Sequence, residues 1–396
     1  MVCREGFVNE LDVKPQQTAR IALPEIADMD FPGAQEVLLN VEYRLKEDQP
    51  LLEAGHCVAY QQLTLKEYTA FSAELKPAAG MVKESTSLGN LRYSASGVEY
   101  SFNKLTGFID GVKIDGMSVL ADGYPVKPNF WRAPTDNDYG VNLQLRFAAW
   151  RSPHYVLESF STEEVGQIRR ITAKYALDNL EGVALTMVYD ISPSGEMRVS
   201  QSLKASAASG RIPGFFRFGM NLVMPGQFST LCYYGNGPEE SYVDRNSSQT
   251  IGVYRQSVNS QYYPYIRPQE NSHRTDVVWF SLSDKKGKGL LVVADDKLEM
   301  NISNYTLESL DSGEFRDNIP QRPSVLTQRH TCDAKPQQLV DLFIDYKMMG
   351  IGGDNSWGAQ PRNEYQIKLN PGKVSYGFTL VPYDTKVDKK SFIKQY

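Results

Sequence analysis

The sequence predicts an all-β protein whose main part is a large antiparallel β-sandwich. Segments rich in β-branched and aromatic residues, bounded by Gly, Pro, Asn or Asp, recur along its 396 residues. Alternation is clearest in residues 197–203, MRVSQSL, where a period of two leaves one polar face, as antiparallel strands do. These runs do not alternate regularly with amphipathic helices, which disfavours a (β/α)₈ barrel or a nucleotide-binding α/β fold.

The expected strands fall into two groups. The first group comprises residues 18–23, 37–45 and 57–65, and the second comprises 183–191, 197–203, 215–224, 277–282 and 290–294. Between the groups, residues 76–87, KPAAGMVKESTS, replace the strand pattern with Pro, Ala, Gly and Ser, which indicates a domain boundary. Because an independent sandwich needs about seven strands, the first domain is expected to be incomplete.

We therefore expect four regions along the chain. They are a partial β-sandwich at 1–78, a linker at 79–86, a large β-sandwich at 87–386 and a lysine-rich tail at 387–396. Three loops of the large sandwich, 121–151, 234–268 and 311–324, are long enough to suggest a binding role.

Composition narrows the function classes. The chain has 42 Lys plus Arg against 47 Asp plus Glu, a net charge of −5, and no basic block, so no nucleic-acid partner is expected. Four scattered cysteines and four histidines give neither a zinc-ligand pattern nor a disulfide framework. Residues 1–12 do not resemble a signal peptide, and apolar runs such as 290–294 are too short to span a bilayer. The chain is expected to be soluble without a membrane partner, and its compartment stays open.

The glycine-rich loop at residues 350–357, GIGGDNSW, is the first candidate site. Asp354 and Asn355 offer short hydrogen-bonding side chains, and Trp357 ends the segment with a large apolar face in a polar, glycine-rich context. This is how a stacking platform for a sugar would be arranged. The alternative is that Trp357 anchors the loop by packing onto the core.

A second candidate is the loop at 130–140, FWRAPTDNDYG, with Arg132, Asp136, Asn137 and Asp138 beside aromatic residues. Guanidinium, amide and carboxylate groups can pair with vicinal sugar hydroxyls. The structural alternative is a turn in which Arg132 neutralises Asp136 or Asp138.

The third candidate lies at 262–274, YYPYIRPQENSHR, where Glu270, His273 and Arg274 precede an apolar strand. A carboxylate and an imidazole could perform general acid/base chemistry there. Strand alternation would place Glu270 and His273 on opposite faces, so they would meet only in a loop. Structural ion pairs at a strand edge are the alternative.

Taken in order, several segments resemble the carboxyl-terminal part of the β-galactosidases of glycoside hydrolase family two. The segments in the large sandwich are FWRAPTDNDYG at 130–140, WRSPHY at 150–155, YYGNGPEESYVDR at 233–245, YIRPQENSHR at 265–274 and MGIGGDNSW at 349–357. Residues 37–45 and 55–62 look like the small sandwich that follows the catalytic barrel of the family. The resemblance spans nearly the whole chain.

The resemblance implies a partial immunoglobulin-like sandwich followed by a large sandwich of galactose-mutarotase-like topology. The acid/base and nucleophilic glutamates, and the magnesium and sodium sites, belong to a (β/α)₈ barrel absent from this sequence. No catalytic residue, cofactor or metal is therefore expected here. Trp357 matches the family's sugar- or aglycone-stacking tryptophan, and Asp354 and Asn355 match its loop neighbours.

The implied function is that of a carboxyl-terminal fragment of a retaining β-galactosidase, which hydrolyses terminal β-D-galactosides such as lactose through a covalent intermediate. The fragment alone is expected to be inactive, and a homo-oligomeric parent enzyme stays open. Two alternatives remain: a stand-alone aldose 1-epimerase using Glu270 and His273, and a non-catalytic carbohydrate-binding or assembly module.

Overall fold

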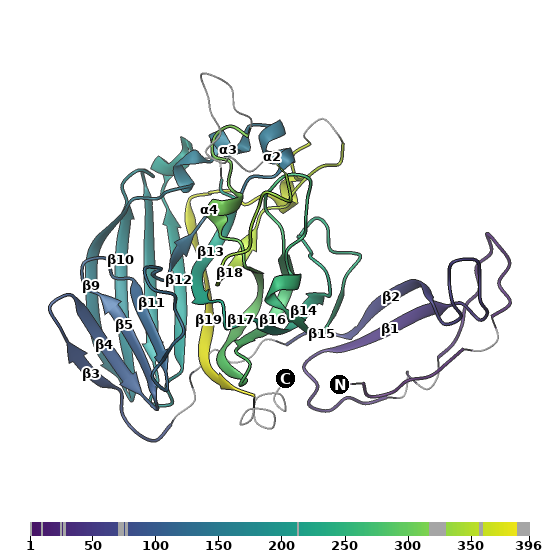
Figure 1. Cartoon of the computed structure of the whole chain (residues 1–396), viewed down its shortest axis with the longest axis horizontal. Helices are drawn as coiled ribbons and strands as arrows, with labels where there is room; N and C mark the ends of the chain where they lie inside the picture. The colour runs from purple at the N-terminus through teal and green to yellow at the C-terminus, as the bar shows by residue number, and fades with distance from the viewer. Residues whose placement is uncertain are drawn as a thin grey trace. The chain divides into compact units, whose positions relative to one another are not determined.

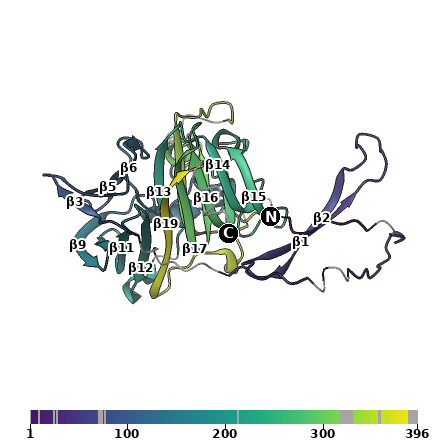
Figure 2. The same cartoon turned by 90° about the horizontal axis from the view of Figure 1, so that it is seen from below.

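The chain forms two compact units, residues 1–69 and 70–396. A computed structural model describes residues 2–8, 11–23, 26, 29–69, 75, 78–211, 214–316, 330–355 and 359–385. Both units are made of antiparallel strands, drawn in Figure 1 and from below in Figure 2. The predicted all-β class is confirmed.

The first unit contains one antiparallel pair, β1 (Val37–Arg44) and β2 (Cys57–Lys66). The strands expected at 37–45 and 57–65 are therefore present. The strand expected at 18–23 is wrong, because these residues have no hydrogen-bonded partner strand and are exposed. On the hairpin, Leu39 lies opposite Leu63 on one face, while Asn40 accepts a hydrogen bond from Gln62 at 2.8 Å on the other.

The second unit contains two sheets. The five-stranded sheet runs β3-β4-β5-β6-β7, and β3 lies inside the segment expected as a linker. Its strands are β3 (Lys83–Thr86), β4 (Asn90–Ala95), β5 (Val98–Asn103), β6 (Ile109–Ile114) and β7 (Met117–Ser118). The twelve-stranded sheet has the order β15-β14-β16-β17-β19-β12-β11-β10-β9, with β18, β13 and β8 branching from β17.

The strands of the large sheet include every strand expected between 183 and 294. They are β8 (Lys127–Asn129), β9 (Tyr155–Val165), β10 (Ile168–Leu177), β11 (Val183–Ile191), β12 (Met197–Ala205), β13 (Arg217–Pro225), β14 (Thr230–Gly237), β15 (Thr250–Ser257), β16 (His273–Ser283), β17 (Lys288–Ser303), β18 (Leu339–Met348) and β19 (Gly372–Asp384). The alternation expected in β12 is observed, because Met197, Val199, Gln201 and Leu203 are buried while Arg198, Ser200 and Ser202 between them are partly exposed.

Part of the core of the second unit lies between the small sheet and strands β9 to β12 of the large one, and the same cluster continues into β13, β14, β16, β17 and β18. Figure 1 shows β3, β4 and β5 in front of these strands, and Figure 2 shows the two layers edge-on. Phe102 of β5 packs edge to face against Tyr189 of β11, with ring centroids 5.2 Å apart. Burial of these apolar faces against each other holds the two sheets together.

Two of the three expected long loops contain more secondary structure than the sequence indicates. Residues 121–151 contain β8, α2 (Asp136–Gly140), α3 (Leu143–Arg146) and the 3₁₀ turn η1 (Ala148–Trp150). The loop expected at 234–268 contains β15, the turn η3 (Val258–Ser260) and the end of β14. Three further short elements are η2 (Ala207–Arg211), α4 (Leu307–Leu310) and η4 (Asn363–Tyr365).

Strand β17 pairs with two different strands on one of its edges. Residues 288–294 pair with β19, whereas residues 299–303 pair with β18. The long strand therefore joins two halves of the sheet, and β18 and β19 separate where it crosses between them. Residues 311–316 of the predicted 311–324 loop are described, but residues 317–324 and the predicted tail lie outside the described residues. No helix among the described residues is long and apolar enough to cross a membrane.

Candidate functional site

The start of the glycine-rich loop is held by side chains from distant parts of the chain. We call residues 349–353 the root of this loop, and Asp354 with Asn355 its tip. Arg132 donates from Nη1 to the carbonyl oxygen of Met349 at 2.6 Å and from Nη2 to that of Gly350 at 3.1 Å. Asn137 donates to the carbonyl oxygen of Ile351 at 2.9 Å. The predicted 130–140 cluster thus binds the root through its backbone.

Asp138 fixes Arg132 in the orientation that this contact requires. Its carboxylate accepts from Arg132 Nε at 3.0 Å and from Nη2 at 2.8 Å, and both side chains are fully buried. The same carboxylate caps α2, because it accepts from the backbone N–H of Thr135 at 2.8 Å. The structural alternative for Arg132 and Asp138 is therefore observed. Asp136, by contrast, is exposed and pairs with Arg316.

A residue that sequence reasoning missed holds the other side of the root. Asp244 accepts from the backbone N–H of Ile351 at 3.1 Å and from that of Gly352 at 2.9 Å, one to each carboxylate oxygen. It lies in the family-like segment 233–245, and the turn closed between Tyr242 and Arg245 presents it. Asp244 is one of three acidic residues in that polar segment, and nothing in the sequence marked it for a loop-binding role.

Close approach explains the glycines of the root. A Cβ atom on Gly350 would lie 2.4 Å from Asp244 Oδ2, and one on Gly353 would lie 2.7 Å from Asn137 Nδ2. Gly352 and Gly353 also have positive φ angles of 64° and 93°. The glycines therefore let Asp244 and Asn137 reach the backbone.

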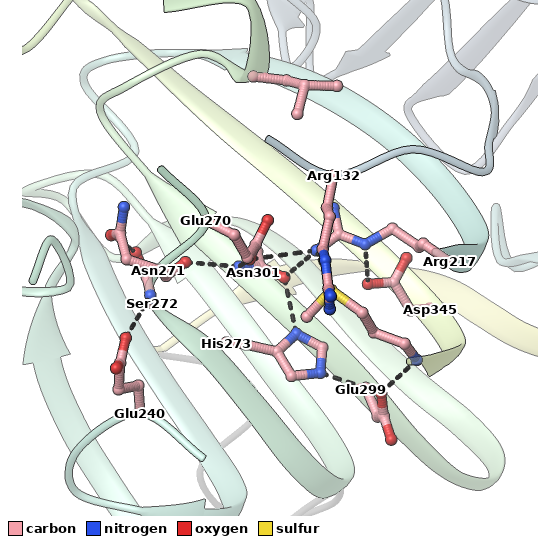
Figure 3. Close-up of polar contacts among 12 residues, drawn as sticks. Arg132, Arg217, Glu240, Glu270, Asn271, Ser272, His273, Glu299, Asn301 and Asp345 are labelled. Carbon is pink, nitrogen blue, oxygen red and sulfur yellow. Dashed lines mark hydrogen bonds and ion pairs between the residues drawn. The ribbon is translucent and has the colours of Figure 1, made fainter. Parts of the chain in front are cut away.

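Glu270 and His273 meet through one amide, as Figure 3 shows. Asn301 donates to Glu270 Oε1 at 2.6 Å and to the carbonyl oxygen of Asn271 at 2.7 Å, which orients its own oxygen toward His273 Nδ1 at 2.7 Å. The loop conformation that this proximity requires is present, because β16 starts only at His273 and Ser272 has a φ of 68°. Asn301 lies within β17 and carried no sequence signal.

Both ring nitrogens of His273 are occupied. Nδ1 faces the oxygen of Asn301, and Nε2 lies 2.9 Å from a carboxylate oxygen of Glu299. The side chain is completely buried, so neither nitrogen is presented to a substrate.

The same network reaches the end of β18, directly before the root of the loop. Glu299 accepts from the backbone N–H of Met348, the last residue of β18, at 2.6 Å. Arg217, fully buried, lies 3.1 Å from Asp345 and 3.4 Å from Glu270. Burial raises the pKa of Asp345 to about 7, although Arg217 lowers it. A layer of buried charge thus supports the loop.

A small pocket lies beside this layer. Its lining includes Glu270, Asn301 and Asp341, together with Tyr305 and Phe343. Asp341 accepts from Asn221 Nδ2 at 2.6 Å and from the backbone N–H of Leu307 at 2.9 Å. Burial raises its pKa to about 7, against the lowering effect of these two donors.

Arg274 is separate from the acid/base pair that was predicted beside it. It donates to Tyr233, Gln261 and three backbone carbonyls, those of Pro238, Ser272 and His273. With its donors used in this way, it anchors the turn after β14 and does not reach Glu270.

The tip of the loop differs from its root. Asp354 is exposed and lies 3.3 Å from Arg362, which is also exposed, and Asn355 is exposed too. Trp357 lies outside the described residues. The substrate-binding role expected for Asp354, Asn355 and Trp357 stays a prediction. Among the described side chains, no group of three or more His, Cys, Asp and Glu residues is placed to hold a metal ion.

Fold and site together define an all-β sandwich protein with a candidate binding loop fixed at one end of its strands. The sequence profile described as beta galactosidase small chain matches residues 94–380, and that described as beta-galactosidase, domain 4, matches residues 2–66. The chain belongs to the β-galactosidase small chain family.

Curated relatives agree with this assignment. A β-galactosidase of Priestia megaterium is 29% identical over 380 residues, covering 96% of this chain and 34% of the relative. A β-galactosidase of Lactobacillus delbrueckii subsp. bulgaricus is 29% identical over 355 residues, covering 89% of this chain and 32% of the relative. The chain spans about a third of the length of these relatives.

Solved structures show weaker likeness. A putative aldose 1-epimerase of Escherichia coli aligns with a TM-score of 0.39 and 10% identity, covering 73% of this chain and 97% of that one. A galactose 1-epimerase of Lactobacillus acidophilus aligns with a TM-score of 0.36 and 8% identity, covering 88% and 99%. Similarity at this level carries no argument about function.

Proposed function

We propose that this chain is the carboxyl-terminal segment of a retaining β-galactosidase and supplies the sugar- or aglycone-facing loop of its active site. The family assignment carries the proposal. The described geometry supports it, because Arg132, Asn137 and Asp244 all bind the root of one loop. A loop held firmly at its root can present its tip in a fixed direction.

In this proposal the chemistry is divided between two parts of the enzyme. The two carboxylates that a retaining glycosidase needs lie outside this chain, as do the magnesium and sodium of the family. This chain contributes binding: Trp357 stacks on the sugar or aglycone, and Asp354 and Asn355 offer hydrogen-bonding groups. Its contribution orients the substrate and does not break the glycosidic bond.

The proposal is tested with a chromogenic β-galactoside. The chain alone is expected to give no hydrolysis, whereas the complete enzyme that contains it hydrolyses the substrate. Replacing Trp357 by Ala in the complete enzyme should raise KM and change the proportion of galactosyl transfer to sugar acceptors. Unchanged KM and transfer in a folded variant would exclude the stacking role.

The epimerase alternative has less support. His273 is buried, and both of its nitrogens are bound within the protein, so it has no free nitrogen for ring-opening chemistry. Polarimetry with pure α-galactose decides the matter. We expect the chain to leave the solvent rate of mutarotation unchanged, and acceleration would favour the epimerase.

A further inference from the structure

A groove lies on the large sheet where β18 and β19 separate. It forms because β17 leaves β19 after Ala294 and joins β18 only at Glu299, so the crossing segment between them opens the sheet. The groove is lined by residues of β12, β17, β18 and β19. Tyr346 lines it and is exposed, whereas its neighbour Asp345 is fully buried in the network below the glycine-rich loop. By strand alternation, the groove is on the opposite face of β18 from that network.

One wall of the groove is polar and fixed. Arg198 of β12 forms an ion pair with Asp295 of β17 and donates to Ser200 at 2.8 Å. Arg198 Nε is buried and has no hydrogen-bond partner among the described residues. A Cβ atom on Gly377 would lie 2.3 Å from Asp295 Oδ2, so a glycine in β19 is needed for this pair to sit across the strands.

The opposite wall is aromatic. Tyr346 is 44% exposed, and its ring centroid lies 6.0 Å from that of Tyr376 and 6.2 Å from that of Phe218. Tyr376 is itself fixed, because its hydroxyl donates to the carbonyl oxygen of Ile344 at 2.7 Å. The neighbouring rings restrict Tyr346 from behind and leave part of its side chain open to the groove.

The chemistry of the lining selects the class of ligand. The cations Arg198 and Lys297 are matched by the anions Asp295 and Asp296, so the groove attracts neither anions nor cations by net charge. Ser200, Ser202 and Ser375 add hydroxyl groups that both donate and accept. A ligand that pairs with hydroxyls and charged groups and also covers an aromatic ring is polyhydroxylated, uncharged and flat on one face.

We propose that this groove is a second carbohydrate-binding site, which takes a neutral saccharide against Tyr346 and the Arg198–Asp295 pair. It does not depend on the proposed role of Trp357, since none of its lining residues belongs to the glycine-rich loop.

Lactose is the probe, and binding to the full chain is followed by calorimetry and by ligand-detected NMR. Measurements use a Trp357→Ala background, in which the proposed loop platform is removed and the groove remains. Ser375→Lys places a long side chain in the groove from an exposed position, so folding should be unaffected. The matched control is Ser161→Lys on β9. Ser161 is an exposed serine on the same face of the sheet, three strands from the groove residue Ser200 of β12, to which it is linked through the paired residues Thr172 and Val188.

Ser375→Lys and Tyr346→Ala are each expected to weaken lactose binding at least about tenfold, which corresponds to about 1.4 kcal/mol. Ser161→Lys should leave the affinity unchanged. If Tyr346→Ala does not fold, Ser375→Lys alone decides. The proposal is overturned if Ser375→Lys binds lactose as well as the control, or if the Trp357→Ala background shows no binding at tens of millimolar lactose. Ser375→Lys is also made in the chain that keeps Trp357; lactose binding retained there but lost with Trp357→Ala alone would support the loop site and reject the groove.

Discussion

Two arginine–aspartate pairs flank the glycine-rich loop and differ in burial and in the number of hydrogen bonds that they share. Arg132 and Asp138, at its root, are 0% and 1% exposed and share two hydrogen bonds. Arg362 and Asp354, at its tip, are 69% and 63% exposed and share one contact of 3.3 Å. The same chemical groups are therefore in different environments at the two ends of one loop.

Burial decides which task each pair has. A buried pair loses its hydration and is tolerated only when its geometry is good and its remaining donors are used, as Arg132 uses them on two backbone carbonyls. An exposed pair is screened by water and contributes little to stability, so its groups are available to a ligand. The root therefore fixes the position of the loop, and the proposed function assigns substrate contact to the tip.

The largest expected effect follows from breaking the buried pair. Arg132→Leu leaves Asp138 buried without its counter-ion and frees two carbonyls of the root, so the free energy of unfolding should fall by about 3–5 kcal/mol. Chemical denaturation measures the change. Arg362→Leu, the same substitution at the exposed pair, is the control and should change stability by less than about 1 kcal/mol. Equal losses in the two variants would show that burial does not distinguish the pairs.

The next largest loss of stability is expected at Asp244, which holds the other side of the loop root. Asp244→Ala removes the acceptor for the N–H groups of Ile351 and Gly352, and we expect a loss of about 1–3 kcal/mol. Hydrogen exchange localises the change, because these two amides should exchange faster while those of β18 do not. Slow exchange at both amides in the variant would mean that Asp244 does not hold the loop.

Much of the fold could be predicted from sequence, because alternation reports which face of a strand is buried. Met197 to Leu203 shows this directly. The strand expected at 18–23 failed because propensity does not supply a pairing partner. Strands β9 and β10 were missed: β9 carries mostly exposed side chains, such as Ser159 and Ser161, so its pattern contains little apolar signal.

The site was predictable only in part. The segments holding Arg132, Asp138, Glu270 and His273 could be selected, but not the partners that determine their roles. Asn301 and Glu299 lie in β17, and their contacts with His273 depend on the pairing of β16 with a bent strand. Contacts of this kind join residues far apart in the chain and leave no local pattern.

Buried and exposed carboxylates should differ in how they make the free energy of unfolding depend on pH. Burial raises the pKa of Asp341 and of Asp345 from the ordinary 3.8 to about 7. Between pH about 4 and about 7 the folded state therefore holds protons that the unfolded state has released. Stability should fall as pH rises through this window, by at most about 1.4 kcal/mol per pH unit for each group.

Asp341→Asn removes one of these titrations and should flatten the dependence, as measured by denaturation at several pH values. Asp354→Asn, at the exposed tip, is the control and should leave the slope as it is in the unmodified chain. An unchanged slope in Asp341→Asn would show that this carboxyl group does not take up a proton on folding in that range.

The smallest effect on stability is expected at the tip of the loop, to which the proposed function assigns substrate binding. Asp354→Ala removes an exposed contact and should change the free energy of unfolding by less than about 0.5 kcal/mol. In the complete enzyme, loss of one hydrogen bond to the substrate should raise KM for a β-galactoside by about fivefold, with a smaller change in kcat. A residue with only a structural role would give the opposite result, a stability loss near that of Asp244→Ala and an unchanged KM. Denaturation and steady-state kinetics on the same variant therefore decide whether the tip differs in function, as well as in burial, from the root that holds it.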